Sequence, residues 1–169
     1  MGRLDLTQER LRSLLHYDPE TGRFVWLVRL GKSWPGLVAG CLTGNGYRHI
    51  RIDGYYYGAH RLAFLYMTGI LPSGPLDHRN HIRDDNRWEN IRPATSQQNS
   101  HNIARRKNNN SGATGVFWHK RDKRWIAHIA DPSTRKRKYL GNFTDKQHAI
   151  DARHQAEVAL FGEFRCEAA

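Results

Sequence analysis

An acid, an imidazole and an amide lie close together in the middle of this chain, in types and spacing suited to hydrolysis of a phosphodiester. Asp77 and His78 are neighbours, and Asn99 follows in a segment that Thr95 can cap as a helix. A hard cation of the Mg²⁺ type takes oxygen ligands and keeps several waters, so one carboxylate and one amide oxygen suffice when phosphate supplies the rest. Asp77 and Asn99 provide those two oxygens.

His78 could supply the general base. A neutral imidazole has a pKa near the working pH and can take a proton from the attacking water. Adjacent residues of a strand point to opposite faces, so Asp77 and His78 can serve one site only where the strand ends or twists. Taken singly, Asp77 and Asn99 fit turn and cap residues, and a lone His fits a surface side chain. The ordered combination favours the catalytic interpretation.

The flanking sequence predicts the elements that position these residues. Thr7 can cap a short helix that continues through Leu15, and the tract 17–22 should break it. Residues 24–30, 46–53 and 55–59 have strand-like patterns, with a hairpin turn at Asp53 and Gly54. A buried helix is expected at 60–67, closed by Gly69. A hairpin that starts at residues 76–78 and a helix that carries Asn99 then follow.

The segment 59–99 reads AHRLAFLYMTGILPSGPLDHRNHIRDDNRWENIRPATSQQN and resembles the HNH endonuclease family. The similarity is to the branch of phage and intron-encoded homing endonucleases with a ββα-metal (His-Me finger) fold. The resemblance implies that Asp77 and Asn99 are metal ligands, His78 is the general base and Asn90 braces the hairpin loop. It further implies that Asn86 and Arg92 support the same loop or approach phosphate, and Arg92 is counted among the DNA-binding residues.

Two positions depart from the family pattern. Asn99 stands where many nuclease toxins have His, and an oxygen ligand there shifts the metal preference from Zn²⁺ toward Mg²⁺, with Mn²⁺ as the alternative. His81 stands where these enzymes commonly have Gly, so the turn after the base is expected to differ in shape. We assign no role to His81. We interpret His60, which begins the predicted apolar helix, as a structural or phosphate-facing residue, and the alternative is a neighbour of the active site.

A second module is predicted near the C-terminus. Residues 115–119, 125–130 and 138–143 have strand patterns, and 144–161 is helical with a stripe of alanines, which predicts a three-stranded sheet backed by one helix. Through SGATGVFWHK, RWIAHIADP, KYLGNF and ALFGEF, this region resembles the Apetala-type DNA-binding domain of plant ethylene-response factors. The resemblance implies that the sheet enters the major groove, where it would contact DNA through Phe117, His119, Arg121, Arg124, His128, Arg137 and Tyr139.

Charge and composition bound the fold and its partner. The 169 residues carry 27 Lys and Arg against 16 Asp and Glu, a net charge of +11, which favours a polyanionic partner. We predict an α+β protein with an HNH portion at 1–104, in which a β-rich subdomain (1–58) precedes the ββα-metal core (59–104). A basic linker at 105–112 follows, in which Arg105, Arg106 and Lys107 would contact DNA, and then the Apetala-like domain at 113–167.

Composition also excludes several classes of protein. The two cysteines form no CxxC pair, which argues against a disulfide framework and against a cysteine-based zinc site. The N-terminal residues are polar, and no run of eighteen apolar residues occurs, so we expect a soluble, unexported protein without membrane contact. By the resemblance it would act in the cytoplasm of a bacterial host and be encoded by a phage or an intron.

These observations together predict a site-preferring homing-type DNA endonuclease. It would use one divalent metal ion, bind double-stranded DNA as a monomer and nick one strand. One alternative is a non-catalytic DNA-binding regulator that keeps the nuclease fold as a scaffold. Another is a basic RNA-binding protein in which Tyr55, Tyr56 and Tyr57 stack on unpaired bases.

Overall fold

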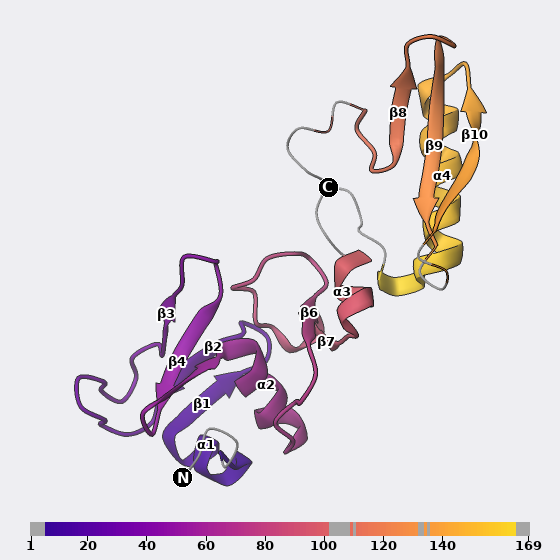
Figure 1. Ribbon diagram of the computed structural model, residues 1–169. Coiled ribbons are helices and arrows are strands. Elements are labelled where there is room, and N and C mark those ends of the chain that lie inside the picture. Colours follow the sequence, from indigo (N-terminus) through magenta and orange to yellow (C-terminus); the bar gives the residue numbers. More distant parts are fainter. Residues whose placement is uncertain (1–5, 102–108, 110, 132–133, 135, 165–169) are drawn as a thin grey trace. The chain divides into compact units, whose positions relative to one another are not determined.

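The computed structural model describes residues 6–101, 109, 111–131, 134 and 136–164. The chain forms two compact units, residues 1–96 and 97–169 (Figure 1). Both combine helices with antiparallel sheets, which confirms the predicted α+β class. In the described part of the chain, no helix is both long and apolar enough to cross a membrane.

The first unit opens with a capped helix and a hairpin. Helix α1 (Gln8–Leu14) begins after Thr7, whose hydroxyl accepts a hydrogen bond from the backbone N–H of Arg10 at 3.2 Å, as predicted. Strand β1 (Leu15–Asp18) pairs with β2 (Arg23–Trp26). The sequence did not reveal β1, because Leu15 continues the helical spacing of the leucines before it and four residues give little alternation to recognise.

A three-stranded antiparallel sheet and a helix complete the upstream half. Strands β3 (Cys41–Leu42), β4 (Arg48–Ile52) and β5 (Tyr55–Gly58) lie in the order β3-β4-β5. Asp53 and Gly54 both have positive φ (48° and 88°), which confirms the predicted tight turn. Helix α2 (Ala59–Thr68) ends at Gly69, which has a φ of 77° and donates its N–H to the carbonyl of Leu65.

One hydrophobic core holds the first unit together. Strand β6 (Leu76–His78) pairs with β7 (Ile91–Pro93), and the short 3-10 helix η1 (Trp88–Asn90) leads into β7. The buried apolar side chains come from α1, β1, β2, β4, β5, α2, β6 and β7, including Leu11, Phe24, Ile50, Leu62, Leu76 and Ile91. The β-rich segment and the hairpin therefore share a single core, whose burial from water stabilises both.

The second unit is a sheet covered by one helix. Helix α3 (Ser96–His101) precedes it, and strands β8 (Val116–His119), β9 (Arg124–Ala130) and β10 (Arg137–Phe143) form an antiparallel sheet in the order β10-β9-β8. Helix α4 (Lys146–Phe161) lies along one face, and η2 (Gly162–Phe164) follows it (Figure 1). The predicted three strands and helix are confirmed. The core between the two layers is small, with Val116, Ala127 and Ala149 buried.

Candidate active site

The β6–β7 hairpin brings Asp77 and His78 to one place. β6 is only three residues long and ends at His78, which meets the geometric condition that the sequence set for the two residues. Both side chains are buried. In the register of the hairpin, Asp77 lies opposite Arg92 and His78 opposite Ile91. The short strand thus places a carboxylate and an imidazole side by side at the start of the loop 79–90.

Arg92 fixes the Asp77 carboxylate. Its Nε and Nη2 donate to Asp77 Oδ2 at 2.9 and 2.8 Å, and the two side chains are only 6% and 5% exposed. Charge-assisted bonds of this kind are short and orient the carboxylate. The sequence suggested that Arg92 contacts DNA; the structure shows it bonded to Asp77, and a DNA contact by Arg92 stays a prediction.

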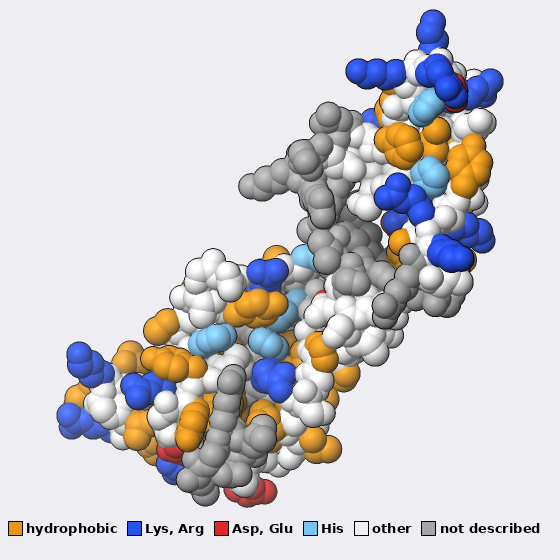
Figure 2. Space-filling view, viewed as in Figure 1, with side chains coloured by type: hydrophobic (Ala, Val, Ile, Leu, Met, Phe, Trp, Pro, Cys, Tyr) orange, Lys and Arg blue, Asp and Glu red, His pale blue; other side chains and the backbone are white. Residues whose placement is uncertain are grey.

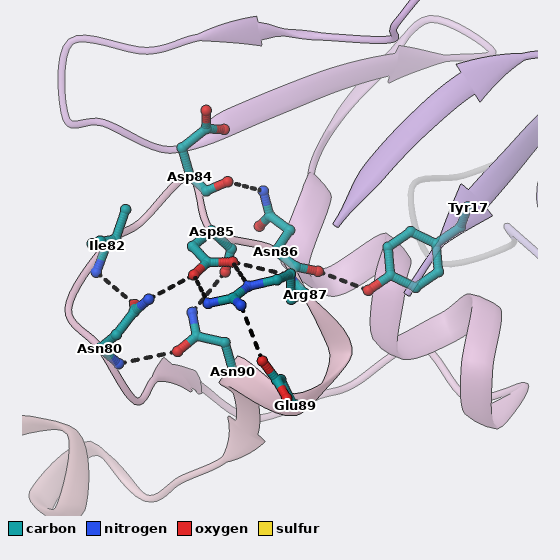
Figure 3. Close-up of polar contacts among 9 residues, drawn as sticks. All are labelled: Tyr17, Asn80, Ile82, Asp84, Asp85, Asn86, Arg87, Glu89 and Asn90. Carbon is teal, nitrogen blue, oxygen red and sulfur yellow. Dashed lines mark hydrogen bonds and ion pairs between the residues drawn. The ribbon is translucent and has the colours of Figure 1, made fainter. Parts of the chain in front are cut away.

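The loop 79–90 is braced from inside by Asn90 (Figure 3). Asn90 Oδ1 accepts from the backbone N–H of Asn80 at 3.0 Å, and its Nδ2 donates to the carbonyl of Asp85 at 2.7 Å. The Asp85 carboxylate accepts from Asn80 and, at 2.7 and 2.8 Å, from Arg87. The hydrogen bonds from Arg87 are the main reason that the pKa of Asp85 is lowered. These bonds close the loop across its base.

The sequence missed the part played by Asp85. Its only signal was an acidic pair, Asp84 and Asp85, embedded among Arg and Asn side chains, which also fits an ordinary solvated loop. The structure separates the two acids. Asp85 bonds within the loop, whereas Asp84 pairs with Arg48 of β4 through two bonds of 2.8 and 2.9 Å.

The outside of the loop packs on the hairpin β1–β2. The buried Tyr17 hydroxyl donates to the carbonyl of Asn86 at 2.7 Å (Figure 3). The N–H of Trp88 donates to the carbonyl of Pro19 at 3.0 Å. Gly22 has a φ of 71°, and a Cβ there would lie 2.4 Å from the backbone nitrogen of Arg87. Only glycine allows this approach.

Aromatic rings surround His78. The ring of His60 lies 5.2 Å from that of His78, centroid to centroid, and the Tyr47 ring lies 5.3 Å from His60 and 5.9 Å from His78. Burial lowers the pKa of His78, against a hydrogen bond with Asn86 and the negative charges of Asp77 and Asp85, which raise it. His78 is therefore neutral at physiological pH and can accept a proton.

His81 has an unusual backbone conformation. Its φ is 63°, in the left-handed region that glycine adopts most easily, and its N–H donates to the carbonyl of His78 at 3.0 Å. The turn after His78 thus has a backbone geometry typical of glycine, although a histidine occupies it. The expectation of a different turn shape at His81 therefore finds no support in the backbone.

Asn99 lies on α3 and is half-buried. It belongs to the unit 97–169, whereas Asp77 and His78 belong to the unit 1–96. Among the described residues no group of three or more His, Cys, Asp or Glu is arranged to hold a metal ion. Of the two metal ligands inferred from the sequence, Asp77 is one of these residue types and Asn99 is not. Their role as metal ligands stays a prediction.

In the second unit, the residues suggested for DNA contact share the face of the sheet that α4 does not cover. Ala127 and Ile129 are buried beneath α4, so His128 points the other way, because side chains alternate between the two faces of a strand. The His128 ring lies 5.6 Å from Phe117 and 5.5 Å from Tyr139, forming a row across the strands. Figure 2 shows hydrophobic and His side chains over this sheet with Lys and Arg around them. The other candidates on this face or its first turn are His119, Arg121, Arg124 and Arg137.

One feature of this unit was not expected from the sequence, and one predicted set of contacts falls outside the described residues. Arg153 is buried within the alanine stripe of α4, where its Nε donates to the carbonyl of Thr114 at 2.7 Å and its Nη2 pairs with Glu157 at 2.9 Å. Nothing in the apolar spacing indicated this role. The predicted linker contacts Arg105, Arg106 and Lys107 fall outside the described residues.

Comparison with known proteins bears on one part of the chain. Comparisons with curated proteins and with solved structures found no match. A family model described as HNH endonuclease matches residues 57–101, which include β6, β7, the loop between them and α3. The C-terminal sheet and helix are not assigned by any match. Residues 57–101 are therefore similar to the HNH endonuclease family, a family of metal-dependent nucleases.

Proposed function

We propose that the chain is a site-preferring, homing-type DNA endonuclease that hydrolyses one phosphodiester bond with one divalent cation. The observation that carries this proposal is the buried pair Asp77 and His78 at the end of β6, inside the segment that matches the HNH family. An acid held by an arginine and a neutral imidazole next to it supply the two protein functions that metal-assisted hydrolysis needs.

The oxygen donors fit a hard cation. Asp77 offers a carboxylate whose orientation is set by Arg92, and Asn99 offers an amide oxygen, a donor set suited to Mg²⁺ or Mn²⁺ rather than Zn²⁺. Such a cation, when bound, stabilises negative charge on the phosphate and on the leaving oxygen. We propose Asp77 and Asn99 as its ligands.

His78 acts as the general base in this proposal. Its lowered pKa keeps the imidazole neutral, so it takes the proton of the water that attacks phosphorus. The nearby carboxylates of Asp77 and Asp85 favour the imidazolium that results. Asn90 keeps the loop after His78 in shape. By family resemblance, the products carry a 5′-phosphate and a 3′-hydroxyl.

The second unit would add affinity and register on double-stranded DNA. Its sheet face carries the row Phe117, His128 and Tyr139, with Arg124 and Arg137 on the same face. Apolar side chains can contact thymine methyl groups, and arginines can contact guanine or phosphate. Such a face can therefore recognise bases in addition to binding the DNA backbone. Linking two weak DNA-binding units raises the effective concentration of each. One catalytic site per chain is consistent with a monomer that nicks one strand.

A nicking assay tests the catalytic proposal. Supercoiled phage and bacterial DNA would be incubated with the purified protein and Mg²⁺ or Mn²⁺, beside His78→Ala, Asp77→Asn and Asn99→Ala. We expect nicked circles from the wild type, loss with a chelator, and rates at least about 100-fold lower for His78→Ala, within the range that general-base catalysis contributes. Tight binding without cleavage under all these conditions would favour the regulator instead.

Salt dependence tests the role of the C-terminal sheet. Arg124→Ala or Arg137→Ala should each reduce the slope of log affinity against log salt by about 1 if the side chain contacts a phosphate. Phe117→Ala and Tyr139→Ala should weaken binding with little change of slope. Val158→Ala, at an exposed apolar position on α4, is the control and should bind like the wild type. Equal binding by all five proteins would refute this interface.

A further inference from the structure

The ring of His60 packs next to the ring of His78. His60 is the second residue of α2, and its ring contacts that of His78 with an interplanar angle of 68°. Tyr47 covers the same pair of rings, and the Arg83 guanidinium lies 5.1 Å from the centre of the Tyr47 ring. Figure 2 shows that His side chains gather on one face of this unit. His60 is partly buried, and its ring lies against the imidazole of the proposed general base.

Gly58 leaves room for that ring. Its backbone has φ −67° and ψ 134°, a conformation that any residue adopts, so backbone freedom does not call for glycine there. A Cβ at Gly58 would lie 2.7 Å from Cε1 and 3.1 Å from Nδ1 of His60, and its three nearest contacts are all atoms of that ring. The missing side chain at position 58 therefore serves the placement of His60.

We propose that His60 is a positioning residue for the general base: its ring, seated against Gly58 and Tyr47, fixes the plane of the His78 imidazole. The inference rests on the proposed role of His78. The χ2 torsion of a histidine has a broad energy minimum, so contacts have to select the ring plane, and packing against His60 acts there together with the hydrogen bond to Asn86. Proton transfer depends on the lone pair pointing at the attacking water, and small misplacements of a reacting group lower rates strongly.

The electrostatics of His60 agree with such a role. Burial, with smaller contributions from charge repulsion by His78, Arg61 and His49, lowers the pKa of His60 to about 3. The ring is neutral at the pH of catalysis, and it adds no positive charge beside a residue that must take up a proton. Its buried Nδ1 has no hydrogen-bond partner among the described residues, so ring contacts and not hydrogen bonds set the place of this edge.

A double-mutant cycle in the nicking assay tests the proposal. His60→Ala and Gly58→Ala should each lower kcat at least about tenfold with KM for plasmid DNA within about twofold, because DNA contacts are unchanged. The double variant should be no slower than His60→Ala, since Gly58→Ala acts only by displacing the His60 ring. His60→Phe, which keeps a flat ring, should recover most of kcat. Gly74→Ala, with open space around it, is the control.

The outcomes separate this inference from the proposed function. If the wild type nicks DNA and His78→Ala does not, then wild-type kcat in His60→Ala, or additive losses in the double variant, would overturn the inference and leave the function intact. If the wild type does not cut, the function fails, and side-chain ¹⁵N signals of His78 provide the test. We expect His60→Ala and Gly58→Ala, but not Gly74→Ala, to shift them; unshifted signals in folded variants would overturn the inference.

Discussion

Replacing Arg92 by Met should destabilise the first unit strongly, because it removes the guanidinium from a buried carboxylate. Asp77 and Arg92 are joined by two bonds of 2.8 and 2.9 Å, and both side chains are almost fully buried. Removing one partner of a buried ion pair typically costs about 3 to 5 kcal/mol. For a unit of this size each kcal/mol lowers Tm by roughly 4 to 8 °C. We therefore expect Arg92→Met to lower Tm by roughly 12 to 40 °C.

The same unit contains a matched control on its surface. Arg10 and Asp53 make two bonds of 2.8 and 3.0 Å, but their side chains are 42% and 31% exposed. Solvent and salt screen exposed pairs of this kind, so they contribute little to stability. Arg10→Met should therefore shift the urea midpoint only slightly, although the chemistry of the two pairs is alike.

Urea denaturation followed by fluorescence and far-UV circular dichroism measures both variants. Adding Asp77→Asn to Arg92→Met should restore more than half of the loss, because the carboxylate charge is then gone as well. Addition of Mn²⁺ should raise the Tm of Arg92→Met more than that of the wild type, since a cation can replace the lost positive charge. A loss below about 1 kcal/mol for Arg92→Met would refute the reasoning from burial.

Two further predictions concern the loop and its surroundings. Gly22→Ala should destabilise the unit more than Gly36→Ala. Both positions have a positive φ, which costs a non-glycine residue about 1 to 2 kcal/mol, but of the two only Gly22 has backbone atoms within 3 Å of the new Cβ. Equal losses of stability in urea would contradict a close contact between Gly22 and the loop. The pKa of His60 is about 3 in the folded chain, against the ordinary value of 6.5 that represents the unfolded chain. Between these two pH values the unfolded chain binds a proton at His60 and the folded chain does not. Stability should therefore fall by about 2 kcal/mol from this residue between pH 7 and pH 5, and the fall should be smaller by that amount in His60→Phe.

Strands with alternating side chains, and helix ends with clear capping residues, could be predicted from the sequence. The Thr7 cap, the turn at Asp53 and Gly54, the end of α2 at Gly69 and the three C-terminal strands are confirmed, because each depends on neighbouring residues alone. Strand β1 was missed because its existence depends on pairing with β2 rather than on its own composition.

The site was predictable as a set of residue types but not as a set of contacts. The spacing of Asp77, His78 and Asn90 carried the family resemblance. The bond from Arg92 to Asp77 and the ring contact of His60 with His78 join residues fifteen or more positions apart, and no local pattern encodes such pairs. The buried Arg153 is a similar case, since an arginine in a stripe of alanines carries no sign of the carbonyl that it will meet.

The bonds from the loop 79–90 to Tyr17, Pro19 and Arg48 limit how the proposed nuclease can be recombined with other proteins. A fragment limited to residues 57–101 would lack β1, β2 and β4, and with them the residues that the loop contacts. Grafting the activity onto a new DNA-binding partner would require the whole segment from α1 onward. The upstream strands therefore shape the loop of the proposed active site, and an exchange of the proposed DNA-binding module would have to be made on the C-terminal side of them.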